Sequence, residues 1–395
     1  MGIAFSKRTN WDVMETALAK ALRELQHSGR PVLDLTASNP THCGFAYNAG
    51  SLLAPLANPA ALDYDPNPRG MLTAREAVCK YYSAHQASLE PQQIFLTTGT
   101  SEAYSWVFRL LCDGGDEVLI AQPSYPLFDF LAVLDDVRLI PYPLIYDHGW
   151  QMDEESLRQR ITPRTRAIAL VNPNNPTGHF TKPWEREMLE RLCREHGLAL
   201  IVDEVFLDYG LDRSAVAHSF AQGPSPVLTF VLSGLSKVAG LPQMKAAWIA
   251  CLGPEPERHL AQDRLEIIAD TFLSMNAPVQ HALPDWLDTS DRIQEQIRRR
   301  VAENLGVLHE LLETQTLVSQ LVIEGGWYAV LRIPAIRPDE ETAIALLAEG
   351  ISLHPGYFFG FPESGWLVVS LLTIPADFFQ GIHGLLQLVK KESKK

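Results

Sequence analysis

The segment Ser233-Gly234-Leu235-Ser236-Lys237-Val238-Ala239-Gly240-Leu241-Pro242-Gln243-Met244-Lys245 is the most informative part of the chain. It lies between two apolar segments, 226–232 and 246–252, whose composition is typical of buried strands. Lysine is seldom buried, so a lysine among small residues and hydroxyls at the edge of a core needs a functional reason. Burial would lower the pKa of the Lys237 amine and favour its neutral, nucleophilic form. The segment therefore predicts a reactive lysine between two core strands.

Short apolar strands alternate with helical patterns over the preceding part of the chain. Strands are predicted at 94–97, 117–121, 137–142, 166–171 and 198–202, and helices at 72–86, 102–112, 153–161 and 183–196. Strands that alternate with helices predict a parallel, doubly wound α/β sheet.

The two ends of the chain carry a different pattern. A helix at 11–27 and a strand at 32–35 open the chain, and helices at 255–270, 285–313, 339–349 and 376–390 and strands at 328–333, 351–354 and 366–372 follow Lys237. At 395 residues the chain exceeds the usual size of a single core. We expect a large domain at 46–285 and a smaller α+β domain at 286–395, to which residues 1–45 contribute.

Composition narrows the class of partner. The 47 acidic residues outnumber the 33 Lys and Arg residues, for a formal charge of −14, which argues against nucleic acid or an anionic membrane as a partner. The five cysteines are scattered singly, as expected for reduced thiols in a cytoplasmic protein, and no metal site is expected. No apolar run approaches the ~20 residues of a membrane span.

A candidate phosphate site follows the strand at 94–97. Gly99, Thr100 and Ser101 turn this strand into a helix, and a small-residue turn at a helix N-terminus exposes backbone N–H groups at the positive end of the dipole. The alternative is that Ser101 is simply an N-cap.

Two further loops begin where predicted strands end. Asn172-Pro173-Asn174-Asn175-Pro176-Thr177-Gly178 follows one strand, and Asp203 follows another. Ligands of open α/β sheets bind at the carboxyl ends of strands. A carboxylate beside a fully apolar strand is costly to bury without a partner, although it could also cap the strand end.

Taken in order, these features resemble the class I/II aminotransferases, a family of fold-type I pyridoxal 5′-phosphate (PLP) enzymes. That family carries a Ser-x-x-Lys or Gly-x-Ser-Lys signature and a cationic residue eight positions after the lysine, which here is Lys245. The resemblance implies that Lys237 binds PLP as a Schiff base and acts as the catalytic base. It also implies that Asp203 pairs with the pyridinium nitrogen as the second catalytic residue, and that Asn175 donates to the phenolate oxygen.

The resemblance assigns roles to other positions as well. Tyr125 would stack on the cofactor ring, and Tyr64 would reach the phosphate of the neighbouring subunit in a homodimer with shared active sites. Asn39, Asn175 and Arg69 are the candidates for substrate binding. The phosphate group would be held within the chain by Gly99, Thr100, Ser101, Ser236 and Lys245.

Three positions depart from the commoner family pattern. Phe206 stands where many relatives have a tyrosine that donates to the phenolate oxygen, so we expect a raised pKa for the Schiff base. Lys245 replaces an arginine, and it can neutralise phosphate without making a bidentate contact. Val368 stands where an arginine would bind the substrate α-carboxylate, and Arg69 and Arg332 are the candidates to replace it.

We therefore expect a PLP-dependent aminotransferase that moves an amino group from an amino acid to a 2-oxo acid through Lys237. Two alternatives remain open at this stage. One is another PLP-dependent reaction on an amino acid, by a C–S lyase, cyclase or decarboxylase, which could use the same residues. The other is a non-catalytic PLP-binding module. The side-chain pocket is built from dispersed loops, so the sequence does not identify the amino donor or acceptor.

Overall fold

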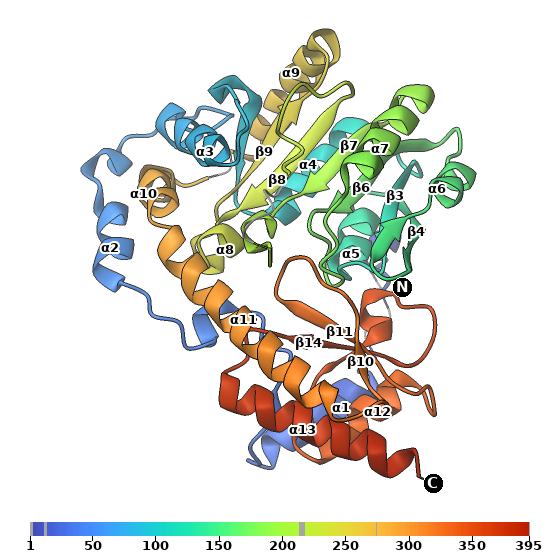
Figure 1. Ribbon diagram of the computed structural model, residues 1–395. Coiled ribbons are helices and arrows are strands. Elements are labelled where there is room, and N and C mark those ends of the chain that lie inside the picture. The colour runs from blue at the N-terminus through green and yellow to red at the C-terminus, as the bar shows by residue number, and fades with distance from the viewer. Residues whose placement is uncertain (1–2, 12–13, 213–217, 274, 395) are drawn as a thin grey trace.

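The chain forms a large body around one wide sheet and a smaller body packed beside it (Figure 1). This computed structural model describes residues 3–11, 14–212, 218–273 and 275–394. In Figure 1 the N- and C-terminal parts of the chain lie together in the smaller body.

The large body contains an eight-stranded sheet in the order β2-β9-β8-β7-β6-β3-β4-β5. The five neighbours from β8 to β4 are parallel, whereas β2, β9 and β5 each pair antiparallel to their neighbours. This arrangement confirms the predicted α/β class with a mostly parallel sheet. The strands are β2 (Ile94–Thr97), β3 (Glu117–Gln122), β4 (Arg138–Tyr146), β5 (Trp150–Met152), β6 (Thr165–Val171), β7 (Ala199–Asp203), β8 (Thr229–Gly234) and β9 (Ala247–Leu252).

Both faces of this sheet are covered, which explains why its central strands are apolar throughout. Along β7, Leu200 and Val202 join one hydrophobic core while Ala199 and Ile201 join the other, as the two-residue period of a strand requires. The helices of the large body are α2 (Ala49–Leu53), α3 (Leu72–Ala84), α4 (Thr100–Leu111), α5 (Leu127–Leu134), α6 (Glu154–Arg160), α7 (Pro183–His196), α8 (Leu235–Val238), α9 (Glu255–Phe272) and α10 (Ala277–Asp288).

The smaller body combines segments from both ends of the chain. Its four-stranded sheet has the order β10-β11-β14-β13, and a separate two-residue strand near the N-terminus, β1, pairs in parallel with β12. The elements are α1 (Ala17–His27), β1 (Leu33–Asp34), α11 (Asp291–Glu313), β10 (Ser319–Gln320), β11 (Tyr328–Arg332), α12 (Asp339–Ala348), β12 (Ile351–Ser352), β13 (His354–Pro355), β14 (Trp366–Ser370) and α13 (Pro375–Glu392). No helix among the described residues has the length and apolar character needed to cross a membrane.

Two predicted helices need correction, and helix α5 is absent from the prediction. The helix expected at 11–27 begins at Ala17, where Thr16 caps it by accepting from the Ala19 N–H, and residues 12–13 lie outside the described part. The segment expected as one helix at 285–313 belongs to two helices. Helix α10 begins earlier, where Asn276 caps it and a proline lies in its first turn, and it ends at Asp288 before α11 begins at Asp291. Helix α5 was not predicted, since its nearly continuous apolar sequence has no clear helical period.

Candidate functional site

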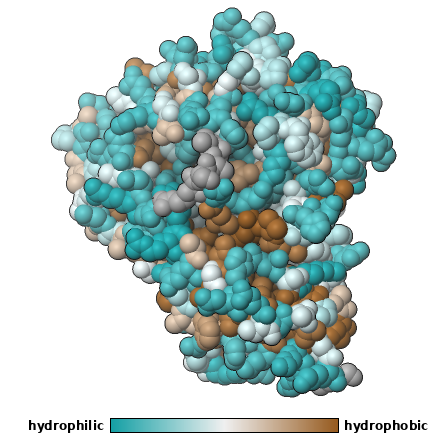
Figure 2. All heavy atoms as spheres, viewed as in Figure 1, coloured by the Kyte–Doolittle hydropathy of each residue, from teal (hydrophilic) through white to brown (hydrophobic). Residues whose placement is uncertain are grey.

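A cavity of about 210 Å³ lies at the carboxyl ends of the central strands, where the large body faces the smaller one. Figure 2 shows apolar surface gathered where the two bodies meet. The large body supplies most of the cavity wall, and the smaller body closes it with two residues. The described lining residues are Ser38, Thr100, Ser101, Tyr104, Tyr125, Leu127, Phe128, Leu131, Val171, Asn175, Asp203, Val205, Phe206, Ser236, Lys237 and Tyr328.

Lys237 enters this cavity from α8, the short helix that follows β8. Its Nζ lies 5.8 Å from the centre of the Phe206 ring and 5.3 Å from that of the Trp327 ring. Burial lowers the pKa of the Lys237 amine, and the nearby Asp203 carboxylate partly opposes this shift. The site thus favours the neutral amine that a nucleophile or general base requires, as the sequence predicted.

Asp203 is the last residue of β7, and its side chain is almost completely buried. Burial raises the pKa of this carboxyl from 3.8 to about 6, although the Val205 N–H, the Tyr104 hydroxyl and Lys237 all favour the carboxylate. The Val205 N–H donates to Asp203 Oδ1 over 3.0 Å. A carboxylate kept at this cost can stabilise a cation bound in the cavity.

The loop after β6 presents one free amide to the cavity. Asn172 and Asn174 accept hydrogen bonds from Thr181 N–H and from the Thr177 hydroxyl, so their side chains hold the loop in shape. Asn175 Oδ1 is instead buried with no hydrogen-bond partner among the described residues. A buried acceptor without a partner is costly, so the position of this side chain at the cavity wall indicates a ligand contact.

A cradle for an anion lies at the N-terminus of α4. Gly99 is the N-cap residue and provides no side-chain cap, so N–H groups of the first turn remain available to a ligand. A Cβ added at Gly99 would lie 3.3 Å from Lys245 Nζ, which places that ammonium group at the helix terminus. Thr100, Ser101 and Ser236 line the adjoining wall, so the structure gathers the predicted phosphate-binding residues of this chain.

Five predicted residues are not among the residues that line the cavity of their own chain. Gly99 and Lys245 lie beside it at the α4 N-terminus, and the other three lie elsewhere. The side chain of Tyr64 is 78% exposed. Arg69 contacts Glu266 Oε2 at 2.7 Å and donates to the Gln92 carbonyl. Asn39 caps a short 3₁₀ helix by accepting from the Thr41 N–H, and its neighbour Ser38 lines the cavity instead.

The structure also shows the surroundings of Phe206 and Val368, which depart from the family pattern, and of Arg332, a candidate to replace the missing arginine. Phe206 lines the cavity and packs edge-on against Trp327, with ring centres 4.9 Å apart. Val368 is fully buried in β14. Arg332 donates to the Ser364 carbonyl and lies 4.3 Å from the centre of the Trp366 ring. Among the described lining residues, only Lys237 has a basic side chain.

Sequence reasoning missed several residues of the cavity wall. Tyr104 follows Thr100 by four positions on α4, so helical spacing could have placed it on the same face. Tyr328 and Ser38 come from the smaller body, and no local pattern indicated that they meet Lys237. Leu127, Phe128 and Leu131 belong to the unpredicted helix α5.

The sequence profile of the family "Aminotransferase class I and II" matches residues 57–375. The chain is 31% identical to the glutamate-pyruvate aminotransferase AlaA of Escherichia coli K12, over 95% of this chain and 96% of the relative. It is 30% identical to an alanine aminotransferase of Mycobacterium tuberculosis H37Rv, over 89% and 83% of the two chains. An Escherichia coli aminotransferase structure superimposes with a TM-score of 0.88 at 26% identity, over 99% of both chains.

These matches span nearly the whole chain and include the strands, loops and helix ends that form the cavity. The matched part contains the buried lysine, the buried carboxylate and the open N-terminus of α4. The chain therefore belongs to the class I and II aminotransferases and is a PLP-dependent enzyme.

Proposed function

We propose that Lys237 is the residue that binds PLP covalently and that it serves as the general base of transamination. The observation that carries this proposal is that one buried amine and one buried carboxylate, Lys237 and Asp203, line the same cavity. Each shift disfavours a charge that a bound cofactor would compensate.

The other cavity residues fit the groups of this cofactor. Asp203 would pair with the pyridinium nitrogen, and the pKa of a carboxyl so paired would fall again. Asn175 Nδ2 would donate to the phenolate oxygen, which requires the side-chain amide to be turned so that Nδ2 faces the ligand in place of the unpartnered Oδ1. The half-exposed Tyr125 ring beside the cavity would pack on the cofactor ring.

The α4 N-terminus would hold the phosphate. Gly99, Thr100 and Ser101 contribute backbone N–H groups, Ser236 a hydroxyl and Lys245 a positive charge. Because lysine cannot make a bidentate contact, we infer that the helix N-terminus provides most of the geometric selection.

PLP supplies an electron sink for the pair of electrons released at the substrate Cα. Lys237 Nζ would take the proton from the substrate Cα and deliver it to C4′ of the cofactor, a transfer that the neutral form of the amine allows. The Phe206 and Trp327 rings keep water from the amine, and Asp203 keeps the electron sink cationic.

We infer that the substrates are amino acids and their 2-oxo acids, and that alanine, glutamate, pyruvate and 2-oxoglutarate are the first to be tested. The names of two relatives, glutamate-pyruvate aminotransferase and alanine aminotransferase, support this choice. The carboxylate of the substrate would meet neutral donors, with Ser38, Asn175 and Tyr328 in reach of the cavity.

A homodimer with shared active sites would account for the residues that lie away from the cavity. We infer that Tyr64 contacts the cofactor phosphate of the partner subunit, since its side chain is exposed in its own chain. Arg69 lies on the same loop, so any contact with substrate would be made across the interface, and Asn39 would support the substrate side through the adjoining Ser38.

We keep the division into residues 46–285 and 286–395, with 1–45 joined to the latter. We also infer a cytoplasmic location, supported by five free cysteines.

The cavity lining also favours a second candidate substrate class, amines without an α-carboxylate. Only Lys237 among the described lining residues is basic, so the chain itself offers no guanidinium to a carboxylate. Such an amine would leave no charge unpaired in the cavity.

The test is a panel of amino donors supplied with pyruvate or 2-oxoglutarate, scored by the amount of new amino acid. We expect turnover with alanine or glutamate, and none with Lys237→Ala. Turnover only with amines that lack a carboxylate would favour the second candidate. Turnover by Lys237→Ala equal to that of the wild type would contradict the proposed role of this lysine.

A further inference from the structure

Three side chains hold the short helix that carries the lysine. Helix α8 has four residues, so most of its carbonyl groups need partners from outside the helix. Tyr209 Oη donates to the Lys237 carbonyl over 2.7 Å, Gln294 Nε2 to the Val238 carbonyl over 2.8 Å, and Tyr47 Oη to the Gly240 carbonyl over 2.8 Å. Of the three, only the Tyr209 hydroxyl contacts the lysine itself.

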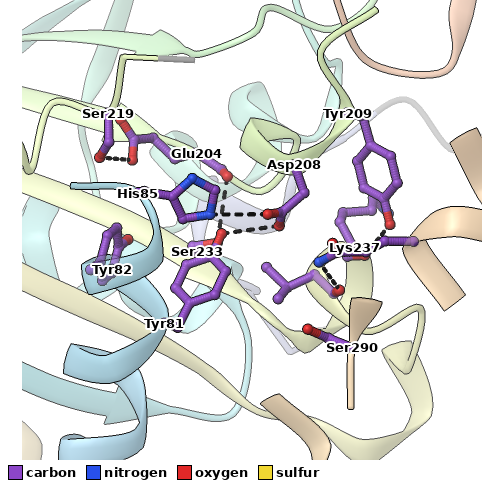
Figure 3. A network of polar contacts seen from close by, with 12 residues as sticks. Tyr81, Tyr82, His85, Glu204, Asp208, Tyr209, Ser219, Ser233, Lys237 and Ser290 are labelled. Carbon is purple, nitrogen blue, oxygen red and sulfur yellow. Dashed lines mark hydrogen bonds and ion pairs between the residues drawn. The ribbon is translucent and has the colours of Figure 1, made fainter. Parts of the chain in front are cut away.

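Tyr209 also packs on the aromatic wall beside the amine. Its buried ring lies 5.1 Å from that of Trp327, which in turn contacts Phe206. The rings of Trp327 and Phe206 are the two near Lys237 Nζ. Tyr209 thus holds the backbone of the lysine with its hydroxyl and supports the wall at the lysine's tip with its ring. Figure 3 shows the Tyr209 hydroxyl directed at Lys237.

The backbone of Tyr209 is joined to the segment that brings Trp327 from the smaller body. The Gly326 N–H donates to the Tyr209 carbonyl over 2.9 Å, and the Leu211 N–H donates to the Glu324 carbonyl over 2.9 Å. Gly210 and Gly325 form an antiparallel bridge between them. These contacts fix Trp327 relative to Tyr209.

A polar network holds the neighbouring residue on the opposite side. Asp208 accepts a hydrogen bond from Tyr81 Oη and contacts His85 Nε2, both at 3.0 Å (Figure 3). Arg298 donates to the Asp208 carbonyl. Tyr209 is therefore held on both sides, and its hydroxyl has little freedom to leave the Lys237 carbonyl.

We propose that Tyr209 is a positioning residue for Lys237: its hydroxyl fixes the lysine backbone, and its ring, through Trp327, fixes the wall that orients the ε-amine. This inference depends on the proposed role of Lys237 as the residue that binds PLP. Orientation of a reacting amine is a large part of its reactivity, so small displacements should slow its reactions.

The test compares Tyr209→Phe with Tyr47→Phe. Each substitution keeps an aromatic ring and removes one hydroxyl that donates to a carbonyl of residues 237–240, but only the first touches the lysine. For each apoprotein we would measure thermal unfolding and the rate at which added PLP becomes covalently bound, followed by absorbance and by borohydride trapping.

We expect both variants to unfold near the wild-type temperature. Tyr209→Phe should bind PLP covalently about fivefold to tenfold more slowly, and its kcat should fall about tenfold with KM within about twofold of wild type. Tyr47→Phe should match the wild type in both rates. Equal rates for the two variants, whether both normal or both slow, would overturn the proposal.

Two further variants, Trp327→Phe and Lys237→Ala, distinguish failure of the Tyr209 inference from failure of the proposed role of Lys237. If Tyr209→Phe does not fold, Trp327→Phe tests the same wall, and wild-type uptake of PLP by a folded Trp327→Phe protein would overturn the proposal. Where Lys237→Ala no longer binds PLP covalently and Tyr209→Phe behaves as wild type, only this inference fails. Covalent binding by Lys237→Ala would instead show that the proposed function of the lysine is wrong.

Discussion

Asp203 is a residue at which the proposed function has a cost in stability, because its carboxyl is buried. An acid whose pKa is higher in the folded than in the unfolded protein holds its proton more tightly in the folded state. For Asp203 the pKa rises from 3.8 to about 6 on folding, because the carboxyl is buried. Its unfavourable contribution to folding is therefore absent below about pH 4, grows as the pH rises from 4 to 6, and is complete above about pH 6.

Asp203→Asn should separate the effect of the Asp203 carboxylate on folding stability from its effect on transaminase activity. The variant removes the buried charge, so the apoprotein should be more stable than wild type at pH 7.5, by on the order of 1–3 kcal/mol. The difference should shrink toward pH 4, while transaminase activity falls at least about a hundredfold. Chemical denaturation across this pH range measures the effect. An apoprotein that is less stable than wild type at pH 7.5 would show that Asp203 has a structural partner instead.

Helix α4 and the turn that contains Lys245 form the element that should recognise the phosphate. Lys245 adopts a left-handed conformation with φ of 52°, which directs it from the turn before β9 toward Gly99. Lys80 offers a comparison, since it is exposed and bound to Asp288 far from the cavity.

Lys245→Gln should weaken PLP binding about tenfold or more, the usual cost of losing a charge-assisted contact. Affinity for pyridoxal, which lacks the phosphate, should be unchanged, and Lys80→Gln should bind both compounds as wild type does. Titration of the apoprotein with each compound provides the measurement. An equal loss for pyridoxal and PLP would show that Lys245 does not act on the phosphate.

Strands and loops with strong local sequence patterns could be predicted from the sequence. Parts of the site that depend on contacts between distant segments could not. The fully apolar strands and the Asn-rich loop are recognisable in the sequence, and they identified Lys237, Asp203 and Asn175 as site candidates. The structure brings these three residues together in one cavity. Helix α5 was missed because its nearly continuous apolar sequence has no clear helical period. The closing residues Ser38 and Tyr328 depend on how the two bodies pack, which no local pattern encodes.

At the scale of the whole molecule, the proposed homodimer would bury several apolar side chains that are exposed in the single chain. Leu53, Leu62, Tyr64 and Leu72 are each more than half exposed and lie in one N-terminal part of the large body. Such residues would be costly to leave in water together, so burial in a homodimer offers a physical reason for them.

Mixing two inactive variants tests whether the sites are shared. Lys237→Ala and Tyr64→Phe subunits, unfolded together and refolded as hybrids, should form one site with both native residues, because each comes from a different subunit. We expect the mixture to recover activity toward a quarter of wild type if Tyr64→Phe alone is strongly impaired. The same variants refolded separately and then combined serve as the control. If the refolded mixture is no more active than this control, Tyr64 acts within its own chain.

Covalent trapping of the cofactor tests the central claim most directly. Purified protein incubated with PLP, reduced with borohydride and digested should yield one peptide that carries the added mass, and fragmentation should place that mass on Lys237. Modification at another lysine, or none at all, would contradict the account.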